Sequence, residues 1–211
     1  MGTLKSAAPL SRATDVADDL YERTRQALDR GDAEAARALI DDAFAQKPED
    51  ADVRELYASL HLARAIRTAA AAREARRQDI VRRDIPYDQE FQDSPEVAKA
   101  FEDALAAVDE VLEAAPDHEK ARMIKASILF RRDREVGRGQ ALEILQSIAA
   151  AHPTNKQVAS TIKKIERPCP RCSDTGFCPS CRGRGSKRLL KMERRCEACH
   201  GQGICLFCGV L

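Results

Sequence analysis

Apolar residues in the first 166 positions of the chain recur at helical spacing, and no stretch there alternates apolar with polar residues as a half-buried strand does. The same region is rich in Ala, Leu, Arg, Glu and Gln, which favour the helical conformation. The pattern therefore predicts a mainly α-helical body. Its helices are expected at residues 13–30, 33–46, 51–82, 95–115, 119–132, 139–151 and 155–166.

The breaks between these helices carry residues that stop or start helices. Gly31 and Asp32 can end one helix and cap the next. Proline disfavours the helical conformation at the residue before it, so Pro48, Pro116 and Pro153 each predict the end of a helix.

The same three prolines mark an internal repeat, because a small or aliphatic residue stands twelve, eight and five positions before each of them. These residues are Ala36, Ile40 and Ala43 before Pro48, Ala104, Val108 and Val111 before Pro116, and Ala141, Leu145 and Ile148 before Pro153.

The segment RGDAEAARALIDDAFAQKPEDADVRELYASL resembles the tetratricopeptide repeat, an antiparallel helix pair whose small residues allow close approach and whose second helix ends at a proline. The first helices lack the usual Trp and Leu-Gly pair, and the 68 residues from Pro48 to Pro116 hold one long helix and a loop at 84–94. The resemblance covers about residues 15–166. It implies a solenoid of helical hairpins over residues 13–166, with a groove that binds a peptide or protein partner. An irregular helical bundle is the alternative, and residues 1–12 are expected to be a flexible N-terminus.

The 211-residue chain has 35 Lys and Arg against 34 Asp and Glu, a net charge of +1, but the two signs are unevenly distributed. Residues 1–166 carry 26 basic and 31 acidic side chains, whereas residues 167–211 carry 9 and 3. A boundary at Arg167 therefore separates two parts of different chemistry. With six Phe, three Tyr and no Trp, a large aromatic-lined cavity and a small-molecule substrate are not expected.

All eight cysteines lie between Cys169 and Cys208, as four CxxC pairs separated by five, fourteen and five residues. A CxxC turn presents two thiolates at the spacing of a tetrahedral site, and two such turns complete a closed structural zinc site. The eight cysteines therefore predict two Zn²⁺ ions. Apolar residues are few in this segment, so metal binding worth on the order of 10 kcal/mol or more per site would supply its folding energy. Nearby glycines are expected at positive φ, which lets backbone N–H groups face the sulfurs: Gly176, Gly183, Gly185, Gly201, Gly203 and Gly209.

Two stretches, CPSCRGRG at 178–185 and CEACHGQG at 196–203, resemble the CxxCxGxG repeats of the cysteine-rich zinc domain of DnaJ-type co-chaperones. The outer repeats are degenerate, since Asp174 replaces a glycine in the first and the fourth stops at CLFCGVL. The resemblance implies a small two-zinc β-hairpin or knuckle module over residues 167–211, in which the first CxxC pair joins the fourth and the second joins the third. It assigns Cys169, Cys172, Cys205 and Cys208 to the first zinc, and Cys178, Cys181, Cys196 and Cys199 to the second.

The pairing of the cysteines stays open from spacing alone. The symmetric 5-14-5 spacing agrees with two arms of a hairpin that turns within residues 186–193, but sequential pairing, first with second and third with fourth, is the alternative. A J-domain is not expected, because its His-Pro-Asp signature has only His152-Pro153-Thr154 as a candidate. Recruitment of a heat-shock chaperone ATPase is therefore not expected either.

Other uses of clustered cysteines fit less well. Cys196, Cys199 and His200 spell the CxxCH haem-attachment pattern, but haem attachment requires export and would leave six cysteines unused. CLFCG resembles a rubredoxin knuckle, which leaves iron as an alternative metal. CxxC is also the dithiol of thiol–disulfide oxidoreductases, which normally place it at the start of a helix in a strand-containing fold.

The compartment is expected to be the cytoplasm. The first sixteen residues lack the apolar core of a signal peptide, and no uncharged run is long enough to span a bilayer. In a reducing compartment, clustered cysteines are metal ligands or redox groups more often than disulfides. No membrane partner is expected.

A basic segment between the two inner CxxC pairs keeps a nucleic-acid partner open, since such a hairpin could track phosphates. Zinc tetrathiolate centres would also attract neighbouring basic residues, and the segment lacks aromatic residues for base stacking. Opposed only by Glu193, its basic residues are Arg182, Arg184, Lys187, Arg188, Lys191, Arg194 and Arg195.

No catalytic residues are expected, because His61, His118 and the many carboxylates fit solvated helix faces better than an acid–base pair. The arginines at 64, 67, 73, 76, 77, 82 and 83 could form a contact stripe for an acidic partner, but a solvated helix face that also carries Glu74 and Asp79 is the favoured interpretation. The sequence thus predicts a non-enzymatic adaptor or chaperone-like protein. Its helical groove would bind a protein or peptide, and its zinc module would add a second contact surface. A zinc-dependent RNA- or DNA-binding protein is the alternative, followed by a thiol–disulfide oxidoreductase.

Overall fold

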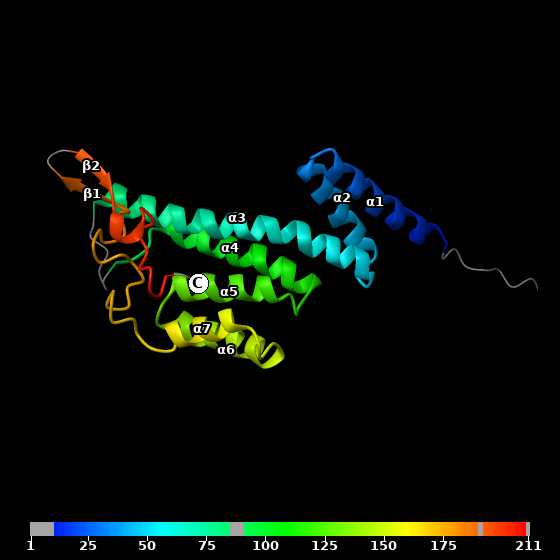
Figure 1. Cartoon of the computed structure of the whole chain (residues 1–211). Coiled ribbons are helices and arrows are strands. Elements are labelled where there is room, and N and C mark those ends of the chain that lie inside the picture. Colours follow the sequence, from blue (N-terminus) through cyan, green and yellow to red (C-terminus); the bar gives the residue numbers. More distant parts are fainter. Residues whose placement is uncertain (1–10, 85–90, 190–191, 210–211) are drawn as a thin grey trace, which may run out of the picture.

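The computed structural model describes residues 11–84, 91–189 and 192–209. Within these ranges the chain is mainly helical, with a small antiparallel sheet near its C-terminal end (Figure 1). Its elements are α1 (Ser11–Asp29), α2 (Ala33–Gln46), α3 (Ala51–Arg83), α4 (Pro95–Ala114), α5 (Glu119–Arg132), α6 (Val136–Ala151), α7 (Lys156–Ile165), β1 (Ser186–Leu189), β2 (Met192–Arg195) and the 3-10 helix η1 (Glu197–Cys199).

The seven predicted helices are all present, and each bound lies within three residues of its predicted position. The predicted flexible N-terminus at 1–12 lies outside the described residues, except for Ser11 and Arg12, which begin α1. No helix in the described ranges is both long enough and apolar enough to cross a membrane.

The largest difference from the prediction is the start of α6, expected at residue 139 and found at Val136. The Asp133 carboxylate accepts hydrogen bonds from the backbone N–H groups of Glu135 and Val136, at 2.9 and 3.0 Å. These bonds satisfy backbone N–H groups at the start of the helix, which lets it begin before its two glycines. Gly137 is needed there, because a Cβ on it would lie 2.1 Å from the carbonyl oxygen of Leu129.

The three prolines of the repeat stand in turns of the same geometry. The residues before them, Lys47, Ala115 and His152, have φ of −133°, −136° and −128° and ψ of 67°, 80° and 71°. The carbonyl of each accepts a hydrogen bond from the N–H three residues later, at 3.0 to 3.2 Å. That third residue then caps the next helix with its side chain, so the sequence repeat is also a repeat of local structure. The capping residues are Asp50, His118 and Asn155.

The nine repeat positions before the prolines are all buried, with at most 1% of each residue exposed. They lie on α2, α4 and α6, which pack against α1, α3 and α5. Each helix packs mainly against its neighbours in sequence, and α3 also contacts α5. Figure 1 shows the result as a row of sequential helix pairs, with α1 and α2 beside the start of α3.

Three apolar clusters hold this helical body together. The largest joins α3, α4 and α5 and includes Phe101. The second joins α5, α6 and α7 and includes Phe130 and Leu145, and the third includes Ile40 of α2 and Val53 of α3. Alanine and valine supply many of the buried positions, which lets neighbouring helices approach closely.

The cysteine-rich module, described at 167–189 and 192–209, packs where α3 and α5 end and α4 begins (Figure 1). The approach to α3 is close, since a Cβ on Gly183 would lie 2.9 Å from the side chains of Ile80 and Phe177. An ion pair of 2.7 Å joins Arg184 of the module to Asp84, the residue that ends α3.

Candidate metal centres and a helical groove

The eight cysteines form two groups of four, and each group could hold one metal ion. All four sulfurs of a group lie within 4.8 Å of one another, and every cysteine is buried. The grouping is the nested one, with the first CxxC pair beside the fourth and the second beside the third. The first group is Cys169, Cys172, Cys205 and Cys208; the second is Cys178, Cys181, Cys196 and Cys199.

A pairing of two chain arms produces this nesting. The Cys178 N–H donates to the Gly203 carbonyl at 2.8 Å, and the Cys205 N–H donates to the Gly176 carbonyl at 2.9 Å. The strands β1 and β2 continue the antiparallel pairing, from Ser186 opposite Arg195 to Leu189 opposite Met192. The turn predicted within residues 186–193 falls on the segment that joins β1 to β2, whose residues 190–191 lie outside the described ranges.

Backbone N–H groups face the sulfurs at three of the four turns. Gly176, Gly185 and Gly203 donate to the sulfur four residues earlier, at 3.4, 3.3 and 3.3 Å. These three glycines have positive φ, as do Gly183 and Gly201, as predicted. The prediction is wrong for Gly209, whose φ is not positive; its N–H donates to the Cys205 carbonyl at 2.7 Å instead.

The four thiols of each group affect one another's ionisation. A hydrogen bond from the Cys208 thiol lowers the pKa of Cys172 to about 5, and the same contact, with burial, raises the pKa of Cys208. In the second group, burial raises the pKa of Cys181 and that of Cys199. Burial and mutual contact thus oppose ionisation of all four thiols in a group. A metal ion bound among them would favour the four-thiolate form, because its positive charge offsets their negative charges.

Arginines of the helical body face the first cysteine group. Arg134 Nη1 donates to the Cys208 sulfur at 3.4 Å, and Arg131 donates to the Gly209 carbonyl. Burial, followed by the nearby guanidiniums of Arg73 and Arg134, lowers the pKa of Arg131 to about 9. Four thiolates around a divalent ion carry a net negative charge, which would relieve this crowding of positive charge. The surroundings of the first group therefore suit a metal–thiolate centre.

Asp174 stands where the DnaJ-type repeat that this segment resembles has a glycine, and it links the module to the helices. Its φ is +62°, so it adopts the backbone conformation that glycine would take there. Its carboxylate accepts a hydrogen bond from the Cys169 N–H at 3.1 Å. The same carboxylate forms an ion pair with Arg138 of α6 and a longer one, of 3.8 Å, with Arg134. The departure from the repeat is thus a contact between the two parts of the chain.

The predicted basic segment is only partly available to a ligand. Arg184 is tied to Asp84, and Arg195 donates to the His200 carbonyl at 2.8 Å through its Nε. Lys191 lies outside the described residues. Arg195 is nevertheless exposed, as are Arg182, Lys187, Arg188 and Arg194.

Two α3 side chains expected on a solvated face are buried instead. His61 is 4% exposed and lies between Asp41 of α2, at 2.7 Å, and Glu110 of α4, at 3.1 Å. Arg76 is 6% exposed, and its Nε donates to Asp93, just before α4, at 2.7 Å. Their partners come from other elements, so the charge pattern along α3 alone could not reveal them.

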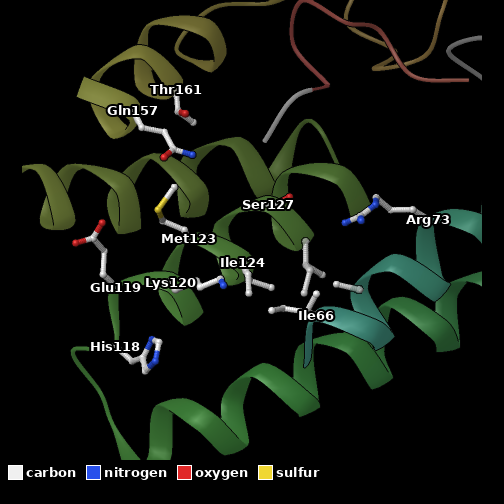
Figure 2. Close-up of a pocket in the computed structure, with 12 residues that line it drawn as sticks. Ile66, Arg73, His118, Glu119, Lys120, Met123, Ile124, Ser127, Gln157 and Thr161 are labelled. Carbon is white, nitrogen blue, oxygen red and sulfur yellow. The ribbon is translucent and has the colours of Figure 1, made fainter. Parts of the chain in front are cut away.

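A groove of about 730 Å³ lies between α3, α5 and α7 (Figure 2). Aliphatic side chains line its middle: Ile66 of α3 and Met123, Ile124 and Ile128 of α5. Ile66 is 40% exposed, so part of this apolar surface faces solvent. Figure 2 shows Glu119 and His118 near one end and Arg73 at the other.

The sequence predicted a groove but not the residues that line it. One pattern could have identified those of α5, namely the helical spacing of Lys120, Met123, Ile124, Ser127 and Ile128, which places them along one side of the helix.

No protein-family model, no curated protein and no solved structure matches this chain. The resemblances to the tetratricopeptide repeat and to the DnaJ-type module therefore rest on the residues and the local structure of the chain itself.

Proposed function

We propose that the chain is a zinc-binding, non-enzymatic adaptor or chaperone-like protein that holds a peptide or protein segment in the α3–α5–α7 groove. The observation that carries the proposal is the coexistence of two buried four-cysteine groups with an aliphatic groove on the helical body. The cytoplasm is the proposed compartment.

Sulfur spacing fits a tetrahedral ion such as zinc. A tetrahedral ion with Zn–S bonds of about 2.3 Å separates its ligand sulfurs by about 3.8 Å. The sulfurs of Cys172 and Cys208 lie 3.5 Å apart, those of Cys178 and Cys196 4.0 Å, and those of Cys181 and Cys199 3.7 Å. Iron in a rubredoxin-like site would use the same ligands and is the alternative that elemental analysis distinguishes.

The repeated proline turns and the buried repeat positions support a tetratricopeptide-like arrangement of α1 to α7. In such an arrangement the first helix of each pair lines the inner face. The helices α3, α5 and α7 each follow one of the proline turns and line the groove, which supports this arrangement. An apolar floor with polar ends suits an extended segment that carries apolar side chains.

Two other functions remain as alternatives. Exposed Arg182, Lys187, Arg188 and Arg194 favour nucleic acid as a second candidate partner. Thiol–disulfide exchange is less well supported, because it needs an accessible thiolate and all eight cysteines are buried in groups of four.

Selection from a displayed random peptide library tests the proposal, with binding of each selected peptide then measured in solution. Ile66→Glu is expected to weaken the selected peptides roughly tenfold, because it places a charge on the apolar floor. Val136→Glu, at a 62% exposed position outside the groove, is the matched control and should leave binding unchanged. Equal effects of the two substitutions would contradict the proposal. Binding of oligonucleotides that is lost in Lys187→Gln and Arg188→Gln would instead favour the nucleic-acid function.

A further inference from the structure

Arg73 of α3 carries a guanidinium that makes no hydrogen bond or ion pair with any residue in the described part of the chain. Most arginines around it are engaged. Arg76 pairs with Asp93, Arg77 with Glu74, and Arg134 with Asp174 and a cysteine sulfur. An arginine left without an anion in such a setting is available to a ligand.

Arg73 is also the point where two hollows of the surface meet. It lines the groove between α3, α5 and α7, and it lines a cleft of about 580 Å³ between α3 and the cysteine-rich module. In the module, Gln202 and Ile204 form part of the far wall of that cleft. The two hollows therefore share one positively charged residue.

The junction cleft, as this second hollow is called below, is rich in positive charge. Arg73, Arg77, Arg131 and Arg195 line it, and Glu74 is the one carboxylate among its described lining residues. Glu74 is already engaged, since Arg77 Nε donates to it at 2.7 Å. Arginines thus outnumber carboxylates by four to one among the described residues that line the cleft, which favours an anionic ligand.

The two ends of the groove differ in charge. Figure 2 shows Glu119 near the end away from Arg73, with the aliphatic side chains between them. A segment with apolar side chains in its middle and a negative charge at one end would match this order. The opposite orientation would place its negative charge beside Glu119, where Lys120 is the neighbouring basic residue of the lining.

We propose that the groove and the junction cleft form one site, which binds an extended peptide whose apolar side chains cover the α3–α5 floor and whose Asp or Glu side chain pairs with Arg73. This inference rests on the groove function proposed above and adds the chemistry of the partner. It also gives the cysteine-rich module a place in the same site, because that module supplies a wall of the junction cleft.

Charge and shape favour a peptide over nucleic acid at this site. Among the described residues that line the groove, His118 is the one aromatic side chain, so bases could stack further only in the junction cleft, on Phe177 and His200. Glu119, at the end of the groove away from that cleft, would repel phosphates. The aliphatic floor of the groove matches Leu, Ile or Met side chains.

Fluorescence anisotropy with the zinc-loaded full-length chain tests the proposal. The probes are fluorescein-labelled, C-terminally amidated peptides of alternating Leu and Ser that end in two Glu or in two Gln. The Glu peptide is expected to bind roughly tenfold more tightly than the Gln peptide. Arg73→Gln should abolish that difference, whereas Arg67→Gln, an exposed arginine of α3 outside both hollows, should preserve it.

The same binding measurements after removal of zinc test whether the module forms part of the site. Chelation of zinc is expected to weaken the Glu peptide and to leave the Gln peptide nearly unchanged, because only the wall of the junction cleft depends on metal. Equal weakening of both peptides would contradict the composite site.

The outcomes separate this inference from the groove function. If Arg73→Gln leaves the Glu-to-Gln ratio unchanged while Ile66→Glu weakens both peptides, the groove function stands and the acidic-peptide inference is wrong. If neither peptide binds, both proposals fail. A fluorescein-labelled oligothymidine that binds, and loses binding in Arg73→Gln, would overturn the peptide in favour of nucleic acid. A Gln peptide can also be made with a free C-terminal carboxylate in place of the amide. If that change alone raises its affinity tenfold, Arg73 pairs with the C-terminal carboxylate of a peptide and not with an acidic side chain, and the inference is wrong.

Discussion

Buried side chains of the helical body form three apolar clusters, whereas those of the described module form two clusters made only of cysteine. Phe101, Phe130 and Leu145 are fully covered in the helices. In the module, Phe207 and Leu206 remain 38% and 41% exposed. One part of the chain thus folds by removing apolar surface from water, and the other has too little apolar surface to do so.

The two parts of the chain should therefore respond to different perturbations. The helical body should depend on its apolar contacts and be insensitive to metal. The module should depend on metal and on the glycines that let its arms approach, because its buried groups are ligands rather than packing residues.

Removal of metal has the largest expected effect. A structural zinc site contributes on the order of 10 kcal/mol or more to folding, so chelation should unfold residues 167–209. The seven helices should persist, since their apolar clusters contain no cysteine. Far-UV circular dichroism would retain the helical signal while amide hydrogen exchange becomes fast in the module alone. Loss of the helical signal on chelation would show that the helical body also depends on metal, which contradicts the prediction.

Truncation of the helical core should have the converse effect. Phe101 is 1% exposed in the largest cluster, so Phe101→Ala should destabilise the helical body by about 3–5 kcal/mol. Thermal unfolding followed by circular dichroism measures this change, and the zinc content should stay at two ions per chain. Phe207→Ala, at an exposed aromatic of the module, is the control and should shift the helical transition by less than about 0.5 kcal/mol.

Alanine substitutions at two glycines should change stability in opposite directions. Gly203 has φ of +73°, and a Cβ on it would lie 2.3 Å from the Gly183 carbonyl oxygen. Gly203→Ala should therefore cost about 1–3 kcal/mol in the module, measured as weaker zinc retention against a competing chelator dye. Gly139 lies within α6 with open space around it, so Gly139→Ala should stabilise the helical body by about 0.5–1 kcal/mol. A zinc affinity that Gly203→Ala leaves unchanged would contradict the close approach of the two arms.

The contact between the two parts should give the smallest effect. Asp174→Asn removes the charge that faces Arg138, and Asn tolerates positive φ and can still accept from the Cys169 N–H. Partly exposed ion pairs contribute about 0.2–1 kcal/mol, so stability should change little. Hydrogen exchange should become faster at the end of α7 and in the first cysteine turn. Unchanged exchange there would show that Asp174 does not hold the module to the helices.

Local features of the sequence predicted most of the fold. Proline and capping residues act over three or four positions, so the helices and the repeated turns could be predicted within three residues. The symmetric cysteine spacing agreed with the nested grouping but could not exclude the sequential one, because the choice depends on pairing between residues 176–178 and 203–205.

Contacts between distant elements could not be predicted. His61 was expected to be solvated because its helix carries many charges, yet it is buried between carboxylates of α2 and α4. The role of Asp174 was hidden in the same way, since Arg138 lies on α6. The groove also joins three helices, so a single helix shows only one side of it.

Native mass spectrometry of the full-length chain tests the central claim most directly, because it reports metal identity, metal number and folding state together. The predicted result is a compact ion whose mass exceeds that of the bare chain by two zinc ions, with the protons of the bound thiols lost. A compact ion without metal, an ion lighter by the hydrogens of four disulfides, or an ion that carries iron would contradict it.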